Sequence, residues 1–264
     1  MKIRTLIAGS VLLLLAGGVA FEQSAQKAPA SGASAQSIVE ELALANRMLS
    51  EEGVLDAYGH VSVRDPRNPN RFYLARHMPA GLVTPSDVIQ YDLDSKALSG
   101  DPNAGYTERF IHGEIYKVRP DVMAVVHDHA PELVAFGVSA TPLRPISHMG
   151  GFIGQDVPVF DIRAAAGDTD MLIRNNQLGR ALAASLGNHT VALMRGHGAV
   201  IVAPSLHVVV GRAYYLSFNA RVQQSAMALG GKLTYLSPEE AKRSSAQDGY
   251  ERAWSLFAAK AKAR

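Results

Sequence analysis

The chain has 264 residues, of which 47% are hydrophobic and 19% charged, a composition typical of a globular protein with one sizeable core. Its formal net charge of +2 falls to zero without residues 1–20, which hold two of the 26 basic residues and none of the 24 acidic ones. No basic stripe remains, so nucleic acid is not expected as a partner. The absence of cysteine excludes disulfides, thiolate metal ligands and a cysteine-linked lipid anchor.

The first residues have the pattern of a secretory signal. Residues 1–20 begin with Lys2 and Arg4, continue with an apolar run and end in the small residues 18–20, which suit a cleavage site. The apolar run is too short for a comfortable membrane span, so we expect no stable span after cleavage; an uncleaved anchor is the alternative. Residues 21–36 are rich in Ala, Ser and Gln and are predicted to be a flexible linker. We therefore expect export across the inner membrane, to the periplasm.

The remaining pattern predicts one α/β domain over residues 37–232 and a polar helical extension over residues 233–264. The sequence contains no internal repeat. In chain order, we expect a helix at 37–52, strands within 58–66, at 72–75 and at 88–92, a helix at 108–118, a strand at 122–129, helices at 131–138 and 175–186, a strand pair around His197, and a long helix at 205–229.

The apolar segment 122–129 ends in two histidines, His127 and His129. Side chains alternate between the faces of a strand, so these two point the same way and suit a divalent metal. A third histidine, His197, also lies where an apolar strand meets a glycine turn. With Glu108, which precedes His127 by 19 residues, they could form an open metal site. The alternative is that they are ordinary histidines at strand ends.

Glu108 is predicted to lie in the first turn of the helix at 108–118, capped by Thr107. The helix dipole favours a carboxylate there, and His112, four residues on, shares its face of the helix. The alternative is that Glu108 is a first-turn charge without a chemical role.

Four motifs follow one another along the chain: Gly59-His-Val-Ser-Val-Arg64, Val83-Thr-Pro-Ser86, Arg119-Pro-Asp-Val-Met-Ala-Val-Val-His-Asp-His129 and Arg195-Gly-His-Gly198. Their order and spacing, with Glu108, resemble the class II aldolase/adducin family from about Ile38 to about Gly230. The resemblance implies a central, mainly antiparallel sheet flanked by helices. It also implies a metal on three histidines, usually zinc, and commonly a homotetramer with active sites between subunits.

Carried over residue by residue, the family's metal ligands fall on His127, His129 and His197, and its acid/base carboxylate falls on Glu108. Adducin-type members are not enzymes and lack the metal histidines. Because this chain keeps all three, the resemblance favours an enzyme. Zn²⁺ is the expected metal, and Mn²⁺, Mg²⁺, Co²⁺ and Fe²⁺ are compatible with the same ligands.

The departures from the family pattern concern the substrate. Where sugar-phosphate aldolases hold phosphate with Asn, Thr and Gly, this chain has His60, Ala57 and Asp87. An aspartate in a phosphate site repels a dianion by about 4 kcal/mol per charge pair at ~4 Å and an effective dielectric near 20. The aldolases' tyrosine acid, which follows a histidine matching His148, falls on Met149. The resemblance therefore implies that phosphate binding and this proton donor are both lost.

Segments 59–66, 108–114 and 160–163 resemble a branch of the family that holds decarboxylases of 2-hydroxy-3-carboxymuconic semialdehyde-type ring-cleavage products and of dihydroxyphthalate-like acids. This resemblance implies a metal-dependent carbon–carbon lyase that acts through a metal-stabilised enolate, with Glu108 moving the proton. A decarboxylase of a hydroxy, keto or aromatic carboxylic acid is the leading hypothesis. An aldolase or epimerase of a non-phosphorylated sugar acid, and a non-catalytic adducin-like binding protein, remain alternatives. The candidate substrate-binding residues are His60, Arg76, His77, Asp87 and His148.

Overall fold

The computed structural model describes residues 34–245 and 249–263, so the predicted signal segment and most of the predicted linker lie outside the described residues. Seven strands form one sheet in the order β3-β2-β1-β4-β7-β6-β5. They are β1 (His60–Arg64), β2 (Arg71–Ala75), β3 (Val88–Asp92), β4 (Ala124–Asp128), β5 (Val159–Phe160), β6 (Val191–Met194) and β7 (Gly198–Ala203). All neighbours are antiparallel except β5 and β6, which are parallel. This mixed, mainly antiparallel α/β sheet confirms the predicted fold class.

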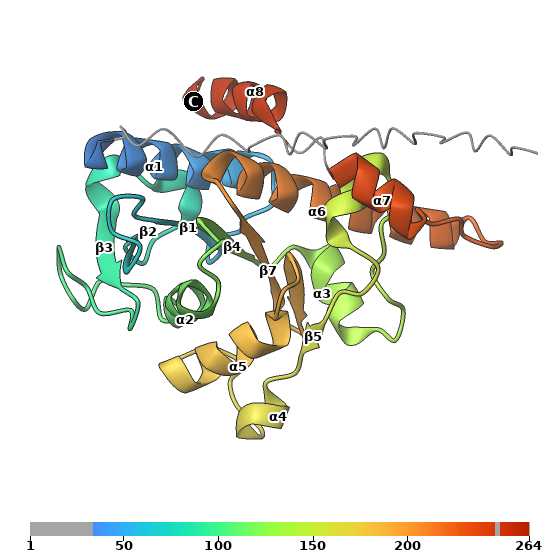
Figure 1. Ribbon diagram of the computed structural model, residues 1–264, viewed down its shortest axis with the longest axis horizontal. Coiled ribbons are helices and arrows are strands. Elements are labelled where there is room, and N and C mark those ends of the chain that lie inside the picture. The colour runs from blue at the N-terminus through green and yellow to red at the C-terminus, as the bar shows by residue number, and fades with distance from the viewer. Residues whose placement is uncertain (1–33, 246–248, 264) are drawn as a thin grey trace, which may run out of the picture. The chain divides into compact units, whose positions relative to one another are not determined.

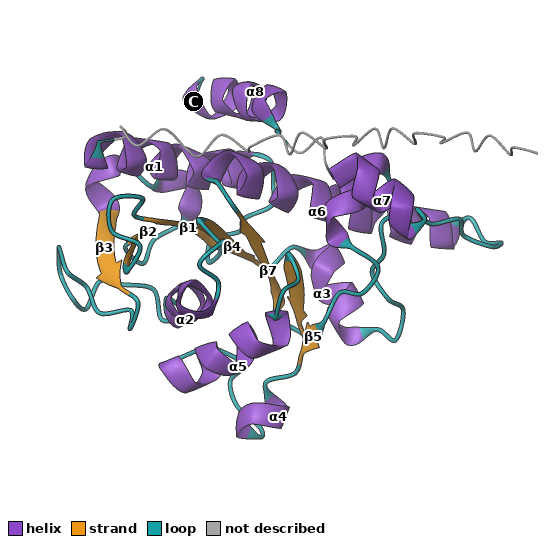
Figure 2. Ribbon diagram, viewed as in Figure 1, coloured by secondary structure: helices purple, strands orange, loops and turns teal. Residues whose placement is uncertain are grey.

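Helices cover both faces of the sheet. One face carries α1 (Ala35–Glu51), α3 (Pro131–Val138), α6 (Leu206–Ala228) and α8 (Glu251–Lys262). The other carries α2 (Phe110–Val118) and α5 (Asn176–Leu186), and Figures 1 and 2 show α1 and α6 on the opposite side of the sheet from α2 and α5. The remaining helices are α4 (Arg163–Ala166), α7 (Pro238–Ser245) and the 3₁₀ turns η1 (Ala80–Leu82), η2 (Pro85–Asp87) and η3 (His148–Ile153). Within 34–245 and 249–263, no helix is both long and apolar enough to cross a membrane.

Strand alternation divides the core and positions the polar residues of β1 and β4. Val126 packs in the cluster beneath α1 and α6, whereas its neighbour Val125 packs in the cluster beneath α2 and α5. In the antiparallel register, Ser62 lies opposite Val125 and His60 lies opposite His127. His60, Ser62 and His127 therefore all face α2.

Two predicted helix starts are wrong. The first helix begins at Ala35 rather than at residue 37, because the Ser34 side chain accepts a hydrogen bond from the Ser37 amide and caps it there. Helix α2 begins at Phe110, so Glu108 lies in a turn before the helix and not in its first turn. The Arg109 amide bonds the Tyr106 carbonyl, which forms a tighter turn than an α-helix, and the predicted Thr107 cap and dipole argument do not apply.

Candidate metal centre

The four predicted metal-site residues meet at one end of the central strands. His127 lies in β4, His129 directly follows this strand, His197 lies in the turn between β6 and β7, and Glu108 lies in the turn before α2. Each offers one ligand atom, and these atoms all lie within 4.8 Å of one another. The three-histidine, one-carboxylate cluster expected from the sequence is thus present.

Glycines allow the β6–β7 turn to bring His197 to this point. Gly196 adopts a left-handed φ of 66°, which suits the three-residue turn that closes this hairpin. A Cβ at Gly198 would collide with the carbonyl oxygen of Asp128, so only glycine lets β7 begin this close to the end of β4. The Gly-His-Gly motif therefore has a structural as well as a chemical role.

The Nδ1 atom of each imidazole is held by a hydrogen bond to an oxygen. The pairs are His127 with the Ala199 carbonyl at 3.0 Å, His197 with the Met171 carbonyl at 2.9 Å, and His129 with the Asp56 carboxylate at 3.1 Å. These acceptors select the Nδ1–H form, which turns an unprotonated Nε2 inward. The Nε2 atoms of His127 and His129 are 3.0 Å apart, and two lone pairs at this distance suit a shared cation. The residues therefore fit a divalent metal.

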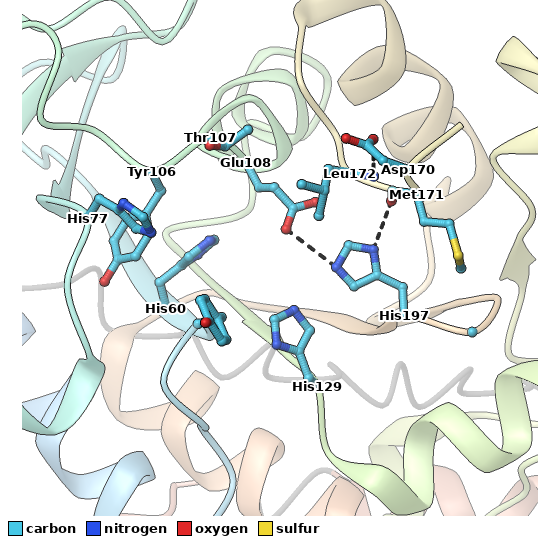
Figure 3. A pocket seen from close by; sticks show the side chains of 12 residues that line it. His60, His77, Tyr106, Thr107, Glu108, His129, Asp170, Met171, Leu172 and His197 are labelled. Carbon is cyan, nitrogen blue, oxygen red and sulfur yellow. Dashed lines mark hydrogen bonds and ion pairs between the residues drawn. The ribbon is translucent and has the colours of Figure 1, made fainter. Parts of the chain in front are cut away.

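Glu108 contributes a buried carboxylate to the cluster. Its Oε1 accepts a hydrogen bond from the Ile173 amide at 2.9 Å, and its Oε2 lies 3.5 Å from His127 Nε2. Oε2 also lies 3.4 Å from His197 Nε2 (Figure 3). Burial opposes ionisation, but His127 and His197, when a proton on Nε2 makes either ring cationic, outweigh burial and hold the pKa of Glu108 below its ordinary value. An ionised carboxylate fixed beside three imidazoles attracts positive charge.

The histidines differ in how easily they bind a proton. Burial, and then the neighbouring His127, lower the pKa of His129 to about 4. Burial also opposes a charge on His197, but the Glu108 carboxylate outweighs it and raises the pKa of His197. Positive charge is therefore favoured on the Glu108 side of the cluster.

Asp56 is the acidic partner of His129. Burial opposes its ionisation, but hydrogen bonds from the Tyr58 and Gly59 amides outweigh it and lower the pKa of Asp56. Asp56 thus stays ionised while it orients the His129 ring.

A cavity of about 530 Å³ opens next to the cluster. Tyr58 contributes to its apolar wall. Tyr106 and Leu172 do so as well, and His60 and His77 contribute polar atoms (Figure 3). Cavities of roughly 300–1,000 Å³ suit small ligands. The combination suits a small, largely apolar molecule with a few polar groups.

Three predicted substrate-binding residues do not line this cavity. Arg76 forms an ion pair of 2.8 Å with Asp87, whose carboxylate also accepts hydrogen bonds from the Thr84 amide and hydroxyl. His148 is exposed at the start of η3. His60 and His77 do line the cavity. The substrate-binding role of all five stays a prediction.

The residues that orient the ligands were not predicted from the sequence. Met171, Ala199 and Ile173 act through backbone atoms, which carry no signature in residue type. Asp56 was recognisable in principle, since an Asp three residues before a glycine often accepts backbone hydrogen bonds in a turn. Ser62 and Tyr116, which join His112 and His60 in a buried hydrogen-bond chain, were also missed.

A mainly antiparallel sheet flanked by helices, with three histidines at the strand ends and a glutamate beside them, defines a class II aldolase-type site. The chain belongs to the class II aldolase/adducin family. The family model for the Class II Aldolase and Adducin N-terminal domain matches residues 40–224. This confirms the family resemblance read from the four motifs.

Two curated relatives are decarboxylases. The chain is 40% identical over 195 residues to decarboxylase TropJ of Talaromyces stipitatus, a match that covers 69% of this chain and 73% of the relative. It is 34% identical over 206 residues to the 3,4-dihydroxyphthalate decarboxylase of Arthrobacter keyseri, a match that covers 74% of this chain and 80% of that relative.

Solved structures share the fold. An aldolase II superfamily protein from Pseudomonas syringae superposes with a TM-score of 0.71 at 23% identity, covering 87% of this chain and 94% of that chain. An L-fuculose 1-phosphate aldolase from Glaciozyma antarctica superposes with a TM-score of 0.67 at 23% identity, covering 89% of this chain and 92% of that chain. At these identities the likeness concerns the fold alone.

Proposed function

We propose that the protein is a metal-dependent decarboxylase of an aromatic carboxylic acid. The carrying observation is the convergence of three imidazole Nε2 atoms and the Glu108 carboxylate beside a cavity with aromatic walls. The similarity to TropJ and to 3,4-dihydroxyphthalate decarboxylase supports decarboxylation of a hydroxylated aromatic acid. A second relative of the latter kind, from Rhodococcus jostii, is 31% identical over 195 residues.

The metal-site residues and Glu108 would have separate roles in the decarboxylation. A divalent cation on this donor set would supply positive charge next to the substrate oxygen nearest the breaking bond. Glu108 Oε2 faces the cluster, because Oε1 is held by the Ile173 amide, and it is placed to accept the proton of a ring hydroxyl. The carbon–carbon bond then breaks, its electron pair stays with the ring, and CO₂ leaves. Glu108 returns its proton to the ring carbon, which leaves the product as a phenolate.

Several finer expectations belong to this proposal. Zinc is the metal we favour, since three imidazoles with one open side suit Zn²⁺. A ring-cleavage product of the 2-hydroxy-3-carboxymuconic semialdehyde type is a further substrate candidate, because it too loses CO₂ next to an oxygen. We also propose export to the periplasm after cleavage near Phe21, and a homotetramer. Mass spectrometry of the exported fraction and light scattering test these two points.

The test is a substrate panel with the purified, metal-loaded protein. The panel holds 3,4-dihydroxyphthalate, hydroxybenzoates, 2-hydroxy and 2-keto acids, and sugar acids, with CO₂ and aldehyde both measured. We expect CO₂ from an aromatic acid, no aldehyde, and loss of activity in His127→Ala. The matched control is His189→Ala, which removes an exposed histidine before β6, at the opposite end of that strand from His197. Aldehyde without CO₂ would instead indicate an aldolase, and no product with a bound metal would indicate a binding protein.

A further inference from the structure

We propose that a directed hydrogen-bond chain, Tyr116–Ser62–His112–His60, fixes His60 as a neutral donor that presents Nε2–H to an anionic oxygen of the substrate. His60 contacts the substrate, and the other three are positioning residues. The inference rests on the proposed function for the substrate class, a hydroxylated aromatic acid, and the experiments below separate the two.

The hydrogen-bond chain forms because β1 and α2 present side chains at matching intervals. His60 and Ser62 are two apart on a strand and share a face about 7 Å apart, at ~3.3 Å per residue. His112 and Tyr116 are four apart on a helix and share a face about 6 Å apart, at ~1.5 Å per residue. The two faces meet, so that each strand residue finds a partner on the helix.

The contacts are short and continuous. Tyr116 Oη lies 2.8 Å from Ser62 Oγ, Ser62 Oγ lies 2.6 Å from His112 Nδ1, and His112 Nε2 lies 2.8 Å from His60 Nδ1. All four side chains are buried, with no residue more than 1% exposed. Buried polar groups need partners, so each proton in this chain has a defined place.

The tyrosine sets the direction. Among the described residues, the Tyr116 hydroxyl bonds Ser62 Oγ alone. If Ser62 donated to Tyr116, the phenol proton would be buried without an acceptor, so Tyr116 donates to Ser62. Ser62 then donates to His112 Nδ1, and His112 Nε2–H donates to His60 Nδ1.

The remaining proton of His60 must therefore lie on Nε2. Burial raises the pKa of Tyr116 and lowers the pKa of His112 to about 3, so the phenol keeps its proton and the imidazole stays neutral. No described residue bonds His60 Nε2, and His60 lines the cavity. The ring packs against Tyr106 with centroids 4.4 Å apart, which holds it in place.

A fixed N–H donor beside the metal cluster selects an anionic oxygen and no cationic group. Figure 3 shows the His60 ring between Tyr106 and the Glu108–His197 pair. His60 adds no charge of its own, because its Nδ1 accepts the proton of His112 Nε2 and only its Nε2 carries a proton. An aromatic acid offers two sources of such an oxygen, its carboxylate and its ionised ring hydroxyl, and both accept from N–H.

The tautomer can be measured directly. In the zinc-loaded protein with ¹⁵N-labelled histidine, NMR should show His60 and His112 protonated on Nε2. Tyr116→Phe removes the proton that sets the direction and should give a mixed population at His60. Tyr91→Phe is the matched control, because its buried hydroxyl has no hydrogen-bond partner among the described residues, and it should leave the His60 signals unchanged.

Two results would contradict the proposed direction of the hydrogen-bond chain. One is His60 protonated on Nδ1 in the wild type, and the other is unchanged His60 signals in Tyr116→Phe. If Tyr116→Phe does not fold, Ser62→Ala tests the same link. That variant removes the donor to His112 Nδ1 and should also give mixed signals at His112 and His60.

Ligand binding tests what His60 contacts. We expect His60→Leu to keep its zinc and to bind 3,4-dihydroxybenzoate on the order of tenfold more weakly by calorimetry, since it loses a hydrogen bond to a charged oxygen. Benzoate and catechol separate the two sources: weaker benzoate binding indicates the carboxylate, and weaker catechol binding indicates the ring oxygen. If none of the three binds more weakly, the donor role is wrong. The absence of CO₂ from every acid would overturn the proposed decarboxylase but would leave the tautomer and the binding result intact.

Discussion

The Nδ1 atom of His197 lies 2.9 Å from the carbonyl oxygen of Met171, a residue whose φ of 69° is left-handed. A non-glycine residue rarely adopts this conformation. Side chains on either side hold it: the Met171 amide bonds the Thr169 hydroxyl at 2.9 Å, and the Leu172 amide bonds the Asp170 carboxylate at 3.2 Å. The loop thus holds a strained residue whose carbonyl orients a metal-site histidine.

The same loop orients a second member of the cluster. Two residues after Met171, the Ile173 amide bonds Glu108 Oε1 at 2.9 Å. One short segment therefore positions both His197 and Glu108, although it contributes no ligand atom of its own. Changes in this loop should act on the metal site as a whole.

We expect Met171→Ile to weaken metal affinity by about 10- to 100-fold, the range typical for loss of a group that orients a ligand. A β-branched side chain disfavours φ near +69°, so the carbonyl turns away from His197. Met171→Gly is the matched variant, because glycine adopts this φ freely and should keep the affinity. Competition with a chromophoric zinc chelator measures both. Equal affinity in Met171→Ile and wild type would contradict the role given to this carbonyl.

Metal removal should lower thermal stability. A ligand that binds only the folded state stabilises it by about 2.7 kcal/mol at a concentration of 100 Kd, so chelation should lower Tm and added metal should restore it. In His197→Ala, the shift in Tm on adding metal should largely disappear, whereas His189→Ala should retain it. Scanning calorimetry with and without chelator provides the comparison. A full metal-dependent shift in His197→Ala would show that the cluster of Glu108, His127, His129 and His197 is not the binding site.

Regular patterns allowed most of the fold to be predicted. Strand β3 spans residues 88–92 and α3 spans residues 131–138, both as predicted. His127 and His129 converge because of strand alternation, which needs no tertiary information. The four-residue helix α4 was not predicted, since so short an element has no periodicity to detect.

Contacts between residues far apart in the chain could not be predicted from the sequence. The carboxylate of Glu108 is held by an amide 65 residues away, and nothing in the residue type of Ile173 indicates this. Arg76 and Asp87 were predicted as separate substrate contacts, a role that stays a prediction; that these opposite charges, 11 residues apart, pair with each other was not predicted. In both cases the partner is chosen by tertiary packing.

The Arg76–Asp87 pair leads to a prediction about phosphate. Asp87 forms an ion pair with Arg76 and adds a negative charge, so inorganic phosphate should be a poor inhibitor. For the same reason, a phosphorylated acid should not be preferred over the same acid without the phosphate. Asp87→Gly frees Arg76 and should increase inhibition by phosphate, by less than about tenfold since exposed ion pairs are worth ~1 kcal/mol or less. Inhibition constants for phosphate in the two proteins test this. Strong inhibition of the wild type by phosphate would contradict it.

Glu108→Gln tests the proton-transfer role. Glutamine has the same length, and its side-chain oxygen can still accept the Ile173 amide hydrogen bond, so the fold and the loop should be kept. It cannot carry a proton between substrate oxygen and carbon, and such a transfer typically contributes about 10²–10⁴ in rate. We therefore expect kcat to fall by about that factor while metal content and Tm stay close to wild type. His127→Ala, in contrast, should lose metal and activity together.

The comparison distinguishes a catalytic Glu108 from one that only holds charge at the site. If Glu108 served as an indispensable ligand, Glu108→Gln would lose metal along with turnover, and excess metal would restore part of the rate. If it served only to place the Ile173 loop, Glu108→Gln would keep both metal and rate, because the amide hydrogen bond survives. Loss of rate with full metal, not reversed by added metal, is the single outcome that requires proton transfer by Glu108. Wild-type turnover in Glu108→Gln on the best acid of the panel would refute the mechanism and leave the metal centre standing.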